Sequence, residues 1–191
     1  VLDDDPTGVQ TVNGIHVYTD WSPESIAEGF AEENAMFFIL TNSRAFQAAE
    51  TEAEHRMIAA RVAVESKRTG KEFMLISRSD STLRGHYPLE TATLAHALEE
   101  NGERIDGEVL MPFFKEGGRF TIGDVHYVQE GADLTPAGET EFARDKTFGY
   151  TASDMKEYIV GHRCRTVLGA DDLVEASARA RKCLVNDVPA V

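Results

Sequence analysis

The segment "FMLISRSDSTLRGHYP", residues 73–88, joins a short apolar run to a dense run of hydrogen-bonding side chains. Residues 73–76 have the length and composition of a buried strand. Residues 77–88 then hold two arginines, an aspartate, a histidine, four serine or threonine hydroxyls, a glycine and a closing proline. A loop that only caps a helix needs one such polar residue. This density therefore predicts a binding loop at the end of a strand.

The rest of the chain repeats this alternation of short apolar runs and longer amphipathic stretches. The pattern predicts an α/β fold with a mostly parallel, Rossmann-like sheet and helices on both faces. The expected strands cover 1–2, 15–19, 35–41, 72–77, 108–111, 166–168 and 183–185. The expected helices cover 23–33, 47–68, 88–100, 153–160 and 171–182. Glycines and scattered β-formers at 113–147 break this rhythm and predict an irregular β-hairpin insertion.

The length and composition indicate one globular domain. The chain has 191 residues, of which 42% are hydrophobic and 27% charged. We expect residues 1–191 to form a single α/β substrate-binding domain. We also expect truncation at both ends, because Val1 and Leu2 resemble the end of a strand and Ala190-Val191 carry no capping signal.

The charge and the cysteines exclude some function classes. A net charge of -14 leaves no basic face for nucleic acid. No apolar run approaches the length of a membrane span, so we expect a cytoplasmic protein without membrane partners. Cys164 and Cys183 lack the spacing of a metal site and are expected to be free thiols in a reducing compartment. No residue is assigned as a metal ligand.

Three polar clusters each follow a predicted strand. They are "DDDPTG" at 3–8, "TNSR" at 41–44 and "RSDSTLRG" at 78–85. In open α/β sheets, ligands bind beyond the carboxyl ends of the strands. We therefore expect the fold to bring these clusters together, although the sequence separates them.

The first two clusters combine carboxylates with a guanidinium. Three adjacent aspartates, Asp3, Asp4 and Asp5, could act as a general base, hold Mg²⁺ or bind substrate hydroxyls, or they could cap a turn. The planar guanidinium of Arg44 matches a carboxylate or phosphate, although a surface ion pair is the alternative.

The third cluster offers every group that a small anion needs. Asp80 could orient or deprotonate a hydroxyl, and Ser81 and Thr82 could donate to an anion. Arg78 and Arg84 supply positive charge. Gly85 permits close approach of the backbone, and Pro88 suits the first turn of a helix, whose exposed amides favour anions. His86 and His126 lie within polar clusters and are weaker candidates.

One alternative is a haloacid-dehalogenase-like phosphatase. The stretch "VLDDDPT" fits that superfamily's aspartate-x-aspartate-x-threonine signature, with Asp3 as nucleophile and Asp5 as acid/base. Asp171-Asp172 could then serve as its acidic motif. Such short matches have a high false-positive rate, and this hypothesis leaves residues 78–88 unexplained. The chain contains no GxxxxGK[ST] loop and no GxGxxG fingerprint.

A second hypothesis explains the three clusters together. In order along the chain, "DDDPTG", "TNSR", "SDSTLRG", "GRFTIGDVHYV" and "TPAGETEFARD" resemble the amino-terminal domain of the four-carbon acid sugar kinase family. The resemblance covers nearly the whole chain. It implies phosphorylation of threonate, erythronate, 3-oxo-tetronate or a similar aldonic acid with ATP and Mg²⁺.

The resemblance also implies roles for individual residues. Asp4 and Asp5 match the family's aspartate pair, which contacts substrate hydroxyls, and Arg44 matches the arginine that binds the substrate carboxylate. The family's "DSTLRG" loop falls on Asp80, Ser81, Thr82, Leu83, Arg84 and Gly85, which would line the sugar-acid pocket. The residues left open for the catalytic base are Asp4, Asp5 and Asp80.

The chain departs from the family at three positions. Arg78 stands where the family usually has lysine, and Pro6 and Val9 mark a variant of its first motif. The family binds ATP largely through a second, carboxyl-terminal domain that these residues do not include. The chain alone is therefore expected to bind a sugar acid without transferring phosphate, and the partner expected for it is a second copy in a homodimer. A non-catalytic binding domain is the remaining alternative.

Overall fold

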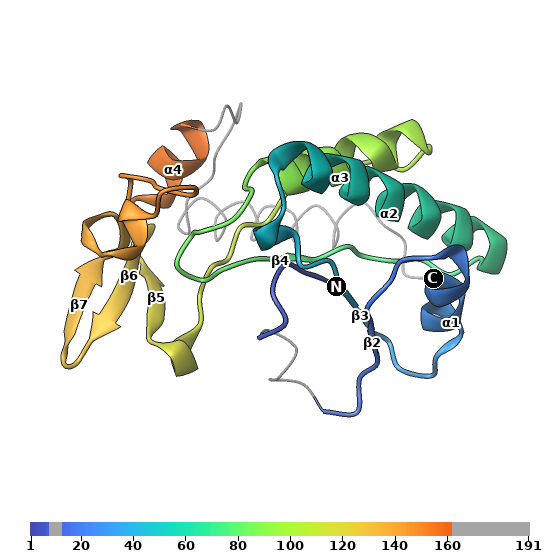
Figure 1. The fold of residues 1–191 in the computed structure, drawn as a ribbon, viewed down its shortest axis with the longest axis horizontal. Coiled ribbons are helices and arrows are strands. Elements are labelled where there is room, and N and C mark those ends of the chain that lie inside the picture. The colour runs from blue at the N-terminus through green and yellow to red at the C-terminus, as the bar shows by residue number, and fades with distance from the viewer. Residues whose placement is uncertain (8–12, 162–191) are drawn as a thin grey trace, which may run out of the picture. The chain divides into compact units, whose positions relative to one another are not determined.

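The computed structural model describes residues 1–7 and 13–161, and the chain divides into two compact units (Figure 1). The first unit comprises Val1–Leu110 and the second begins at Met111. Among the described residues, no helix combines the length and apolar character that crossing a membrane requires. The strands expected at 166–168 and 183–185, the helix expected at 171–182 and both cysteines lie outside this part.

The first unit is built on a four-stranded parallel sheet. Its strands are β1 (Leu2–Asp3), β2 (Val17–Tyr18), β3 (Phe38–Leu40) and β4 (Ser77–Arg78), in the order β2-β3-β1-β4. The predicted parallel α/β sheet is confirmed. β2 and β3 are shorter than the predicted strands 15–19 and 35–41, β1 lies one residue later than predicted, and β4 shares only Ser77 with the predicted strand 72–77.

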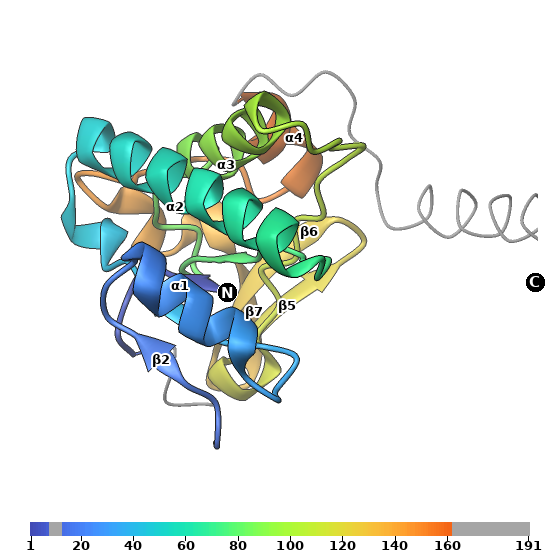
Figure 2. The ribbon, with the colours of Figure 1, turned by 90° about the vertical axis from the view of Figure 1, so that its right-hand side faces the viewer.

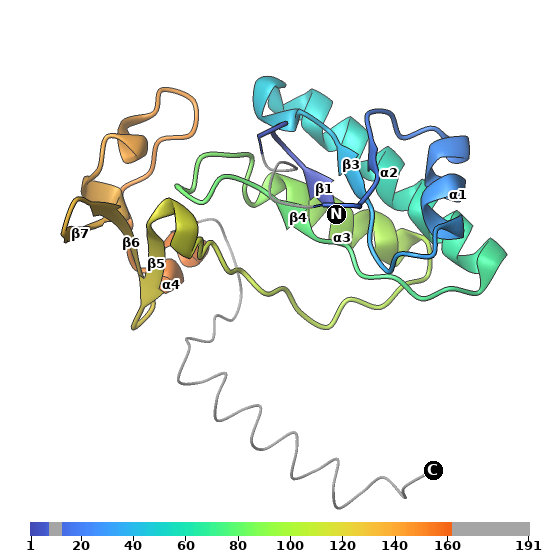
Figure 3. The ribbon, with the colours of Figure 1, turned by 90° about the horizontal axis from the view of Figure 1, so that it is seen from below.

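The register of β1 places the polar clusters side by side. Asp3 pairs with Leu40 on one side and with Arg78 on the other. All three strands run in the same direction, so the loops that follow them leave from one edge of the sheet (Figure 3). This is the convergence that the sequence predicted.

Local signals in the sequence set the helix boundaries. The helices of this unit are α1 (Pro23–Ala31), α2 (Ala48–Thr69) and α3 (Leu89–Glu100). Ser22 caps α1 by accepting a hydrogen bond from the Ser25 amide. Gln47 and Glu50 form a reciprocal capping box at the start of α2. Gly70 ends α2 in the left-handed conformation, with φ at 68°.

One apolar core joins the three helices to the sheet. Figure 2 shows α2 lying along α1 and α3. The core consists of Leu2, Ile26, Phe30, Ile39, Ile58, Ala59, Val62, Ala63, Leu94, Ala97 and Leu98. Leu2 and Ile39 are paired across β1 and β3, so their side chains share one face of the sheet. The three helices therefore cover that face.

The apolar run at 73–76 is half buried, where the sequence suggested a fully buried strand. Phe73 and Leu75 pack against the core, whereas Met74 is 81% exposed and Ile76 47%. Alternate side chains of an extended segment point in opposite directions, which explains this split.

The second unit contains a three-stranded antiparallel sheet and α4 (Met155–Gly161). Its strands are β5 (Arg119–Ile122), β6 (Val125–Glu130) and β7 (Asp133–Pro136). Gly123 and Asp124 both have positive φ, as a two-residue hairpin turn of type I′ requires. The β-rich insertion is confirmed. The strand predicted at 108–111 is wrong, because residues 103–113 have no strand or helix.

Candidate functional site

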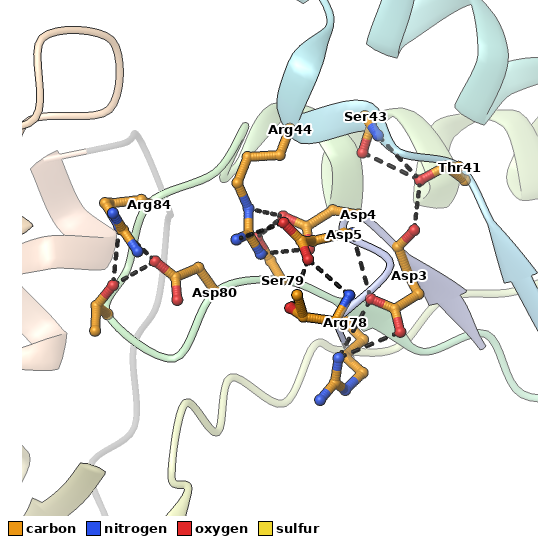
Figure 4. Close-up of polar contacts among 12 residues, drawn as sticks. Asp3, Asp4, Asp5, Thr41, Ser43, Arg44, Arg78, Ser79, Asp80 and Arg84 are labelled. Carbon is orange, nitrogen blue, oxygen red and sulfur yellow. Dashed lines mark hydrogen bonds and ion pairs between the residues drawn. The ribbon is translucent and has the colours of Figure 1, made fainter. Parts of the chain in front are cut away.

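The three polar clusters meet at the carboxyl edge of the parallel sheet (Figure 4). Backbone hydrogen bonds hold the loops together. The Thr41 amide donates to the Asp3 carbonyl at 2.9 Å, the Arg44 amide to the Asp4 carbonyl at 3.3 Å, and the Asp4 amide to the Arg78 carbonyl at 3.2 Å. The loop after β1 is thereby fixed between the loops after β3 and β4.

Asp4 lies at the centre of the site and is 3% exposed. Arg44 binds its carboxylate with two hydrogen bonds, Nε to Oδ2 at 3.0 Å and Nη2 to Oδ1 at 2.7 Å. Ser79 Oγ donates to Oδ2 at 3.0 Å. Burial raises the pKa of Asp4 to about 6, the bonds from Arg44 and Ser79 oppose this, and the charge of Glu90 adds to it. Burial thus moves the pKa of Asp4 from the ordinary aspartate range toward neutral pH.

Asp5 is the most accessible of the three adjacent aspartates, with 27% of its side chain exposed. Arg44 also reaches it, through Nη1 to Oδ2 at 3.2 Å. Hydrogen bonds from the hydroxyl and amide of Thr7 lower the pKa of Asp5. Asp5 is therefore ionised and presents a hydrogen-bond acceptor at the surface. The sequence left two alternatives for Arg44, binding of a ligand carboxylate or an ion pair within the chain. The structure shows the ion pair, with Asp4 and Asp5.

Asp3 is fully buried and pairs with Arg78, whose Nη1 lies 3.2 Å from both carboxylate oxygens. Burial raises the pKa of Asp3, and the charge of Arg78 opposes this. The side chain of Arg78 is 35% exposed. The phosphatase hypothesis needs Asp3 as an accessible nucleophile, which this burial contradicts. Asp171 and Asp172, which would supply the acidic motif of that hypothesis, lie outside the described residues.

The loop at 80–85 forms its own compact turn. Arg84 Nε donates to Asp80 Oδ2 at 2.6 Å, Thr82 donates to the same oxygen, and the Leu83 amide donates to the Asp80 carbonyl at 2.9 Å. Burial acts to raise the pKa of Asp80, but the bonds from Thr82 and Arg84 lower it. Leu83 has φ at 65°, a strained value of the kind that clusters at functional sites.

Two further members of this loop differ in exposure and contacts. Ser81 is partly exposed, whereas the backbone of Gly85 packs against the site. A methyl group on Gly85 would collide with Ser79 Oγ and come within 3.7 Å of Asp4 Oδ2. The close approach expected of this glycine is thus a contact with the residues that bind Asp4.

The two histidine candidates are in different units. His86 lies in the loop before α3, with Nε2 3.1 Å from the Phe46 carbonyl. His126 belongs to β6 of the second unit, where it is fully buried beside Thr121 Oγ1 at 3.0 Å. Within the first unit, His86 lies directly after the third cluster.

The start of α3 does not present amides to an anion in the way that the sequence suggested. The helix begins at Leu89, with Pro88 in the position before it. Glu90, in the first turn, is 2% exposed and supplies a negative charge there itself.

Glu90 and its partners form a buried layer that sequence reasoning missed. Ser43 Oγ donates to Glu90 Oε1 at 2.7 Å, and Ser77 Oγ lies 3.4 Å from Oε2. His55 Nε2 lies 3.8 Å from Oε1. The sequence did contain a signal for the burial of Glu90. Glu90 stands four and eight residues before Leu94 and Leu98, on the same buried stripe of α3.

The described residues contain no group of three or more His, Cys, Asp or Glu side chains placed to hold a metal ion. The aspartates at the sheet edge are instead paired with arginines. In chemical terms, each arginine of these pairs can bond an anionic group of a ligand, and each aspartate can accept a hydrogen bond from a ligand hydroxyl.

Comparison with known proteins found one matching family and similar solved structures. The family model described as the sugar-binding N-terminal domain matches residues 1–186. Two crystal forms of a domain of unknown function (DUF1537) from Bordetella bronchiseptica are similar in fold, each solved with bound citrate as a domain-swapped dimer. Their identities are 24% and 23%, with TM-scores of 0.58 and 0.55.

The matches cover different shares of the two sides. Each Bordetella match covers 83% of this chain, but the chain spans 39% and 38% of those two structures. A comparison with curated proteins found no match.

Proposed function

Because the chain belongs to the family of sugar-binding amino-terminal domains of four-carbon acid sugar kinases, we propose that it binds the acid which such an enzyme phosphorylates. The substrate class is a four-carbon aldonic acid such as threonate, erythronate or 3-oxo-tetronate. One observation carries the proposal: Arg44, Arg78 and Arg84 form ion pairs with four aspartates at the ends of β1 and β4, namely Asp3, Asp4, Asp5 and Asp80.

The acid's carboxylate is bound by arginine. Arg44 and Arg78 are 25% and 35% exposed; Arg44 is bonded to Asp4 and Asp5 through all three of its nitrogens, and Arg78 to Asp3 through Nη1. Guanidinium groups bind carboxylates with paired, charge-assisted hydrogen bonds. In this proposal the ligand carboxylate replaces Asp5 at Nη1 of Arg44. Asp5 is the partner that is displaced first, because it is more exposed than Asp4.

The acid's hydroxyls are bound by the carboxylates and hydroxyls of the same edge. Asp5 is ionised and partly exposed, so it accepts from a substrate hydroxyl. Ser81, Arg84 and Asp80 lie in the loop after β4 and complete the set of donors and acceptors. A polyhydroxy acid needs this combination of a few convergent polar groups.

Asp4 is the proposed acceptor of the proton from the attacking hydroxyl. A general base works best when its pKa is near the working pH, and burial raises the pKa of Asp4 to about 6. The pKa values of Asp5 and Asp80 are lowered, so these two carboxylates are weaker bases. Asp4 is 3% exposed in the chain without ligand, so this role requires that the ligand displace part of the Arg44 contact with Asp4 as well as the contact with Asp5.

ATP and Mg²⁺ belong to this proposal as partners from outside the described residues. When bound, ATP supplies the phosphoryl group and Mg²⁺ balances its charge. The described residues do not fit a magnesium site, because their aspartates are paired with arginines. The part of the reaction assigned to this chain is therefore binding, orientation and uptake of the hydroxyl proton.

The citrate bound in the two Bordetella structures is a hydroxy acid, which supports the class of ligand. Those structures are domain-swapped dimers, and we propose a dimer for this chain as well. Light scattering of the chain in solution tests that assembly, and a monomer at all concentrations contradicts it.

Calorimetric titration of the chain tests the ligand. The probes are threonate and erythronate, with threitol and erythritol as matched sugar alcohols that lack the carboxylate. We expect binding of at least one acid, no binding of either alcohol, and loss of binding in Arg44→Ala. Arg56→Ala is the control, because Arg56 forms an exposed ion pair with Glu100.

Two outcomes would contradict the proposal. Equal binding of acid and alcohol would show that no arginine recognises the carboxylate. Release of phosphate from a phosphoester without ATP, abolished by Asp3→Asn, would favour the phosphatase instead.

A further inference from the structure

Glu90 is a buried charge where an apolar residue would be the simpler choice. It is 2% exposed and lies on the stripe of α3 that carries Leu94 and Leu98 into the core. Burying a carboxylate is costly unless it is hydrogen-bonded. The partners that the described residues give it are two serine hydroxyls and His55, with no lysine or arginine. A role beyond packing is needed to explain it.

The two serines that contact Glu90 precede the two residues that bind Asp4. Ser43 donates to Oε1, and the next residue, Arg44, binds both oxygens of Asp4. Ser77 lies 3.4 Å from Oε2, and two residues later Ser79 donates to Asp4 Oδ2 at 3.0 Å. The buried carboxylate of Glu90 thus contacts both chain segments that bind the carboxylate of Asp4.

The remaining contacts fix Glu90 in place. His55 Nδ1 donates to the Thr51 carbonyl at 2.8 Å, a bond that orients the ring with Nε2 toward Glu90. Thr41 Oγ1 lies 3.0 Å from the Asp3 carbonyl and 3.2 Å from Ser43 Oγ, the two acceptors within reach of its single proton. Because Glu90 lies in the first turn of α3, the helix dipole favours its negative charge.

We propose that Glu90 is a positioning residue of the sugar-acid site, which fixes through Ser43 and Ser77 the loops that bring Arg44 and Ser79 onto Asp4. This inference rests on the proposed function for its meaning, because Asp4 and Arg44 are the groups assigned to proton uptake and carboxylate binding. Glu90 itself does not touch the ligand.

The charge of Glu90 gives the proposal a second consequence. The titratable and charged groups around Asp4 are Asp3 and Asp5 of its own loop, Arg44 after β3, Arg78 and Asp80 after β4, Glu90 of α3 and, beyond it, His55 of α2. The negative charge of Glu90 favours the protonated form of Asp4. Neutralising Glu90 therefore lowers the pH at which Asp4 titrates.

The test measures two NMR signals of the site on the full 191-residue chain, with no ligand added. One signal is hydrogen exchange of the Arg44 Nε–H, which is bonded to Asp4. The other is the titration midpoint of the Asp4 carboxyl carbon, assigned by its absence in Asp4→Asn. The variants are Ser43→Ala, which removes the tether to the loop, and Glu90→Gln, which keeps the size and removes the charge.

Glu65→Gln is the matched control, because Glu65 is also largely buried but pairs with Arg68 on α2. We expect Ser43→Ala to speed exchange of the Arg44 Nε–H about tenfold, the loss expected for one buried hydrogen bond. We expect Glu90→Gln to lower the Asp4 midpoint and Glu65→Gln to change neither signal.

Unchanged signals in both variants, or equal changes in the control, would overturn the positioning role. If Glu90→Gln does not fold, Ser43→Ala decides the question alone. The chain's failure to bind any sugar acid would overturn the proposed function instead, since neither NMR signal depends on a ligand.

Discussion

The guanidinium of Arg44 binds the carboxylate of Asp4 through two hydrogen bonds, Nε to Oδ2 at 3.0 Å and Nη2 to Oδ1 at 2.7 Å. Lysine keeps the charge of arginine but cannot form both bonds. Arg44→Lys is expected to lower the free energy of unfolding by about 2 kcal/mol, because a buried charge loses a partner. Urea unfolding measures this.

The control for this substitution is Arg56→Lys. Arg56 and Glu100 form an ion pair with 43% and 50% of their side chains exposed. Exposed pairs contribute little, so the change should stay within about 0.5 kcal/mol. Similar losses at both positions would mean that the Arg44–Asp4 pair contributes no more than a surface pair.

Asp4→Asn is expected to change how stability depends on pH. The pKa of Asp4 is raised from 3.8 to about 6 in the folded protein. The stability that its proton contributes is fully present below about 3.8 and is lost as the pH rises through about 6. Relative to Asp4→Asn, the wild-type unfolding free energy should fall by roughly 3 kcal/mol across that window.

Urea unfolding of both proteins at several pH values measures this difference. The effects of Asp3, Asp5 and Asp80 occur in both proteins and cancel to first order. A difference that does not vary with pH would show that Asp4 titrates at its ordinary value.

Gly85→Ala is expected to abolish sugar-acid binding while the chain stays folded. The added methyl group displaces Ser79 Oγ, which then loses its bond to Asp4. The loss of that bond should reduce the unfolding free energy by about 1 kcal/mol. Calorimetric titration and urea unfolding measure the two effects.

Gly107→Ala provides the matched control, because a methyl group there meets nothing within 4 Å. It should leave binding unchanged and stability equal or slightly higher. Wild-type affinity in Gly85→Ala would show that Ser79 has no part in the site.

Ile58→Ala tests the core that supports the site. Ile58 of α2 is fully buried among the side chains of the first unit. Its truncation should cost about 3 kcal/mol. Val64, on the same helix, is 60% exposed, so Val64→Ala should change the unfolding free energy by less than about 0.5 kcal/mol. Equal costs would contradict the assigned core.

Local patterns predicted the parallel sheet and the polar loops that meet at its edge. Alternating strands and helices predicted the parallel sheet, and the polar runs after Leu2, Leu40 and Ile76 predicted which loops meet. These inferences succeeded because strand direction alone decides that the loops leave from one edge.

The partners of individual side chains could not be predicted in the same way. The sequence offered Arg44, Arg78 and Arg84 to a ligand, whereas each also binds an aspartate of the chain. The pairing of Arg44 and Arg78 depends on distances across the sheet, which no local pattern encodes, whereas Arg84 pairs with Asp80 within one loop. Likewise, the apolar residues at 108–111 suggested a strand, but Val109 is 83% exposed and Met111 74%, and neither has a partner strand among the described residues.

The central position of β1 has a consequence for the order of folding. Leu2 comes early in the chain, yet it pairs with both Ile39 and Ser77. Contacts between residues so distant in sequence form late, because the intervening chain must first lose its freedom. During synthesis, the three acidic residues leave the ribosome well before the arginines that neutralise them. The charge balance of this edge is therefore completed only after most of the first unit has been made.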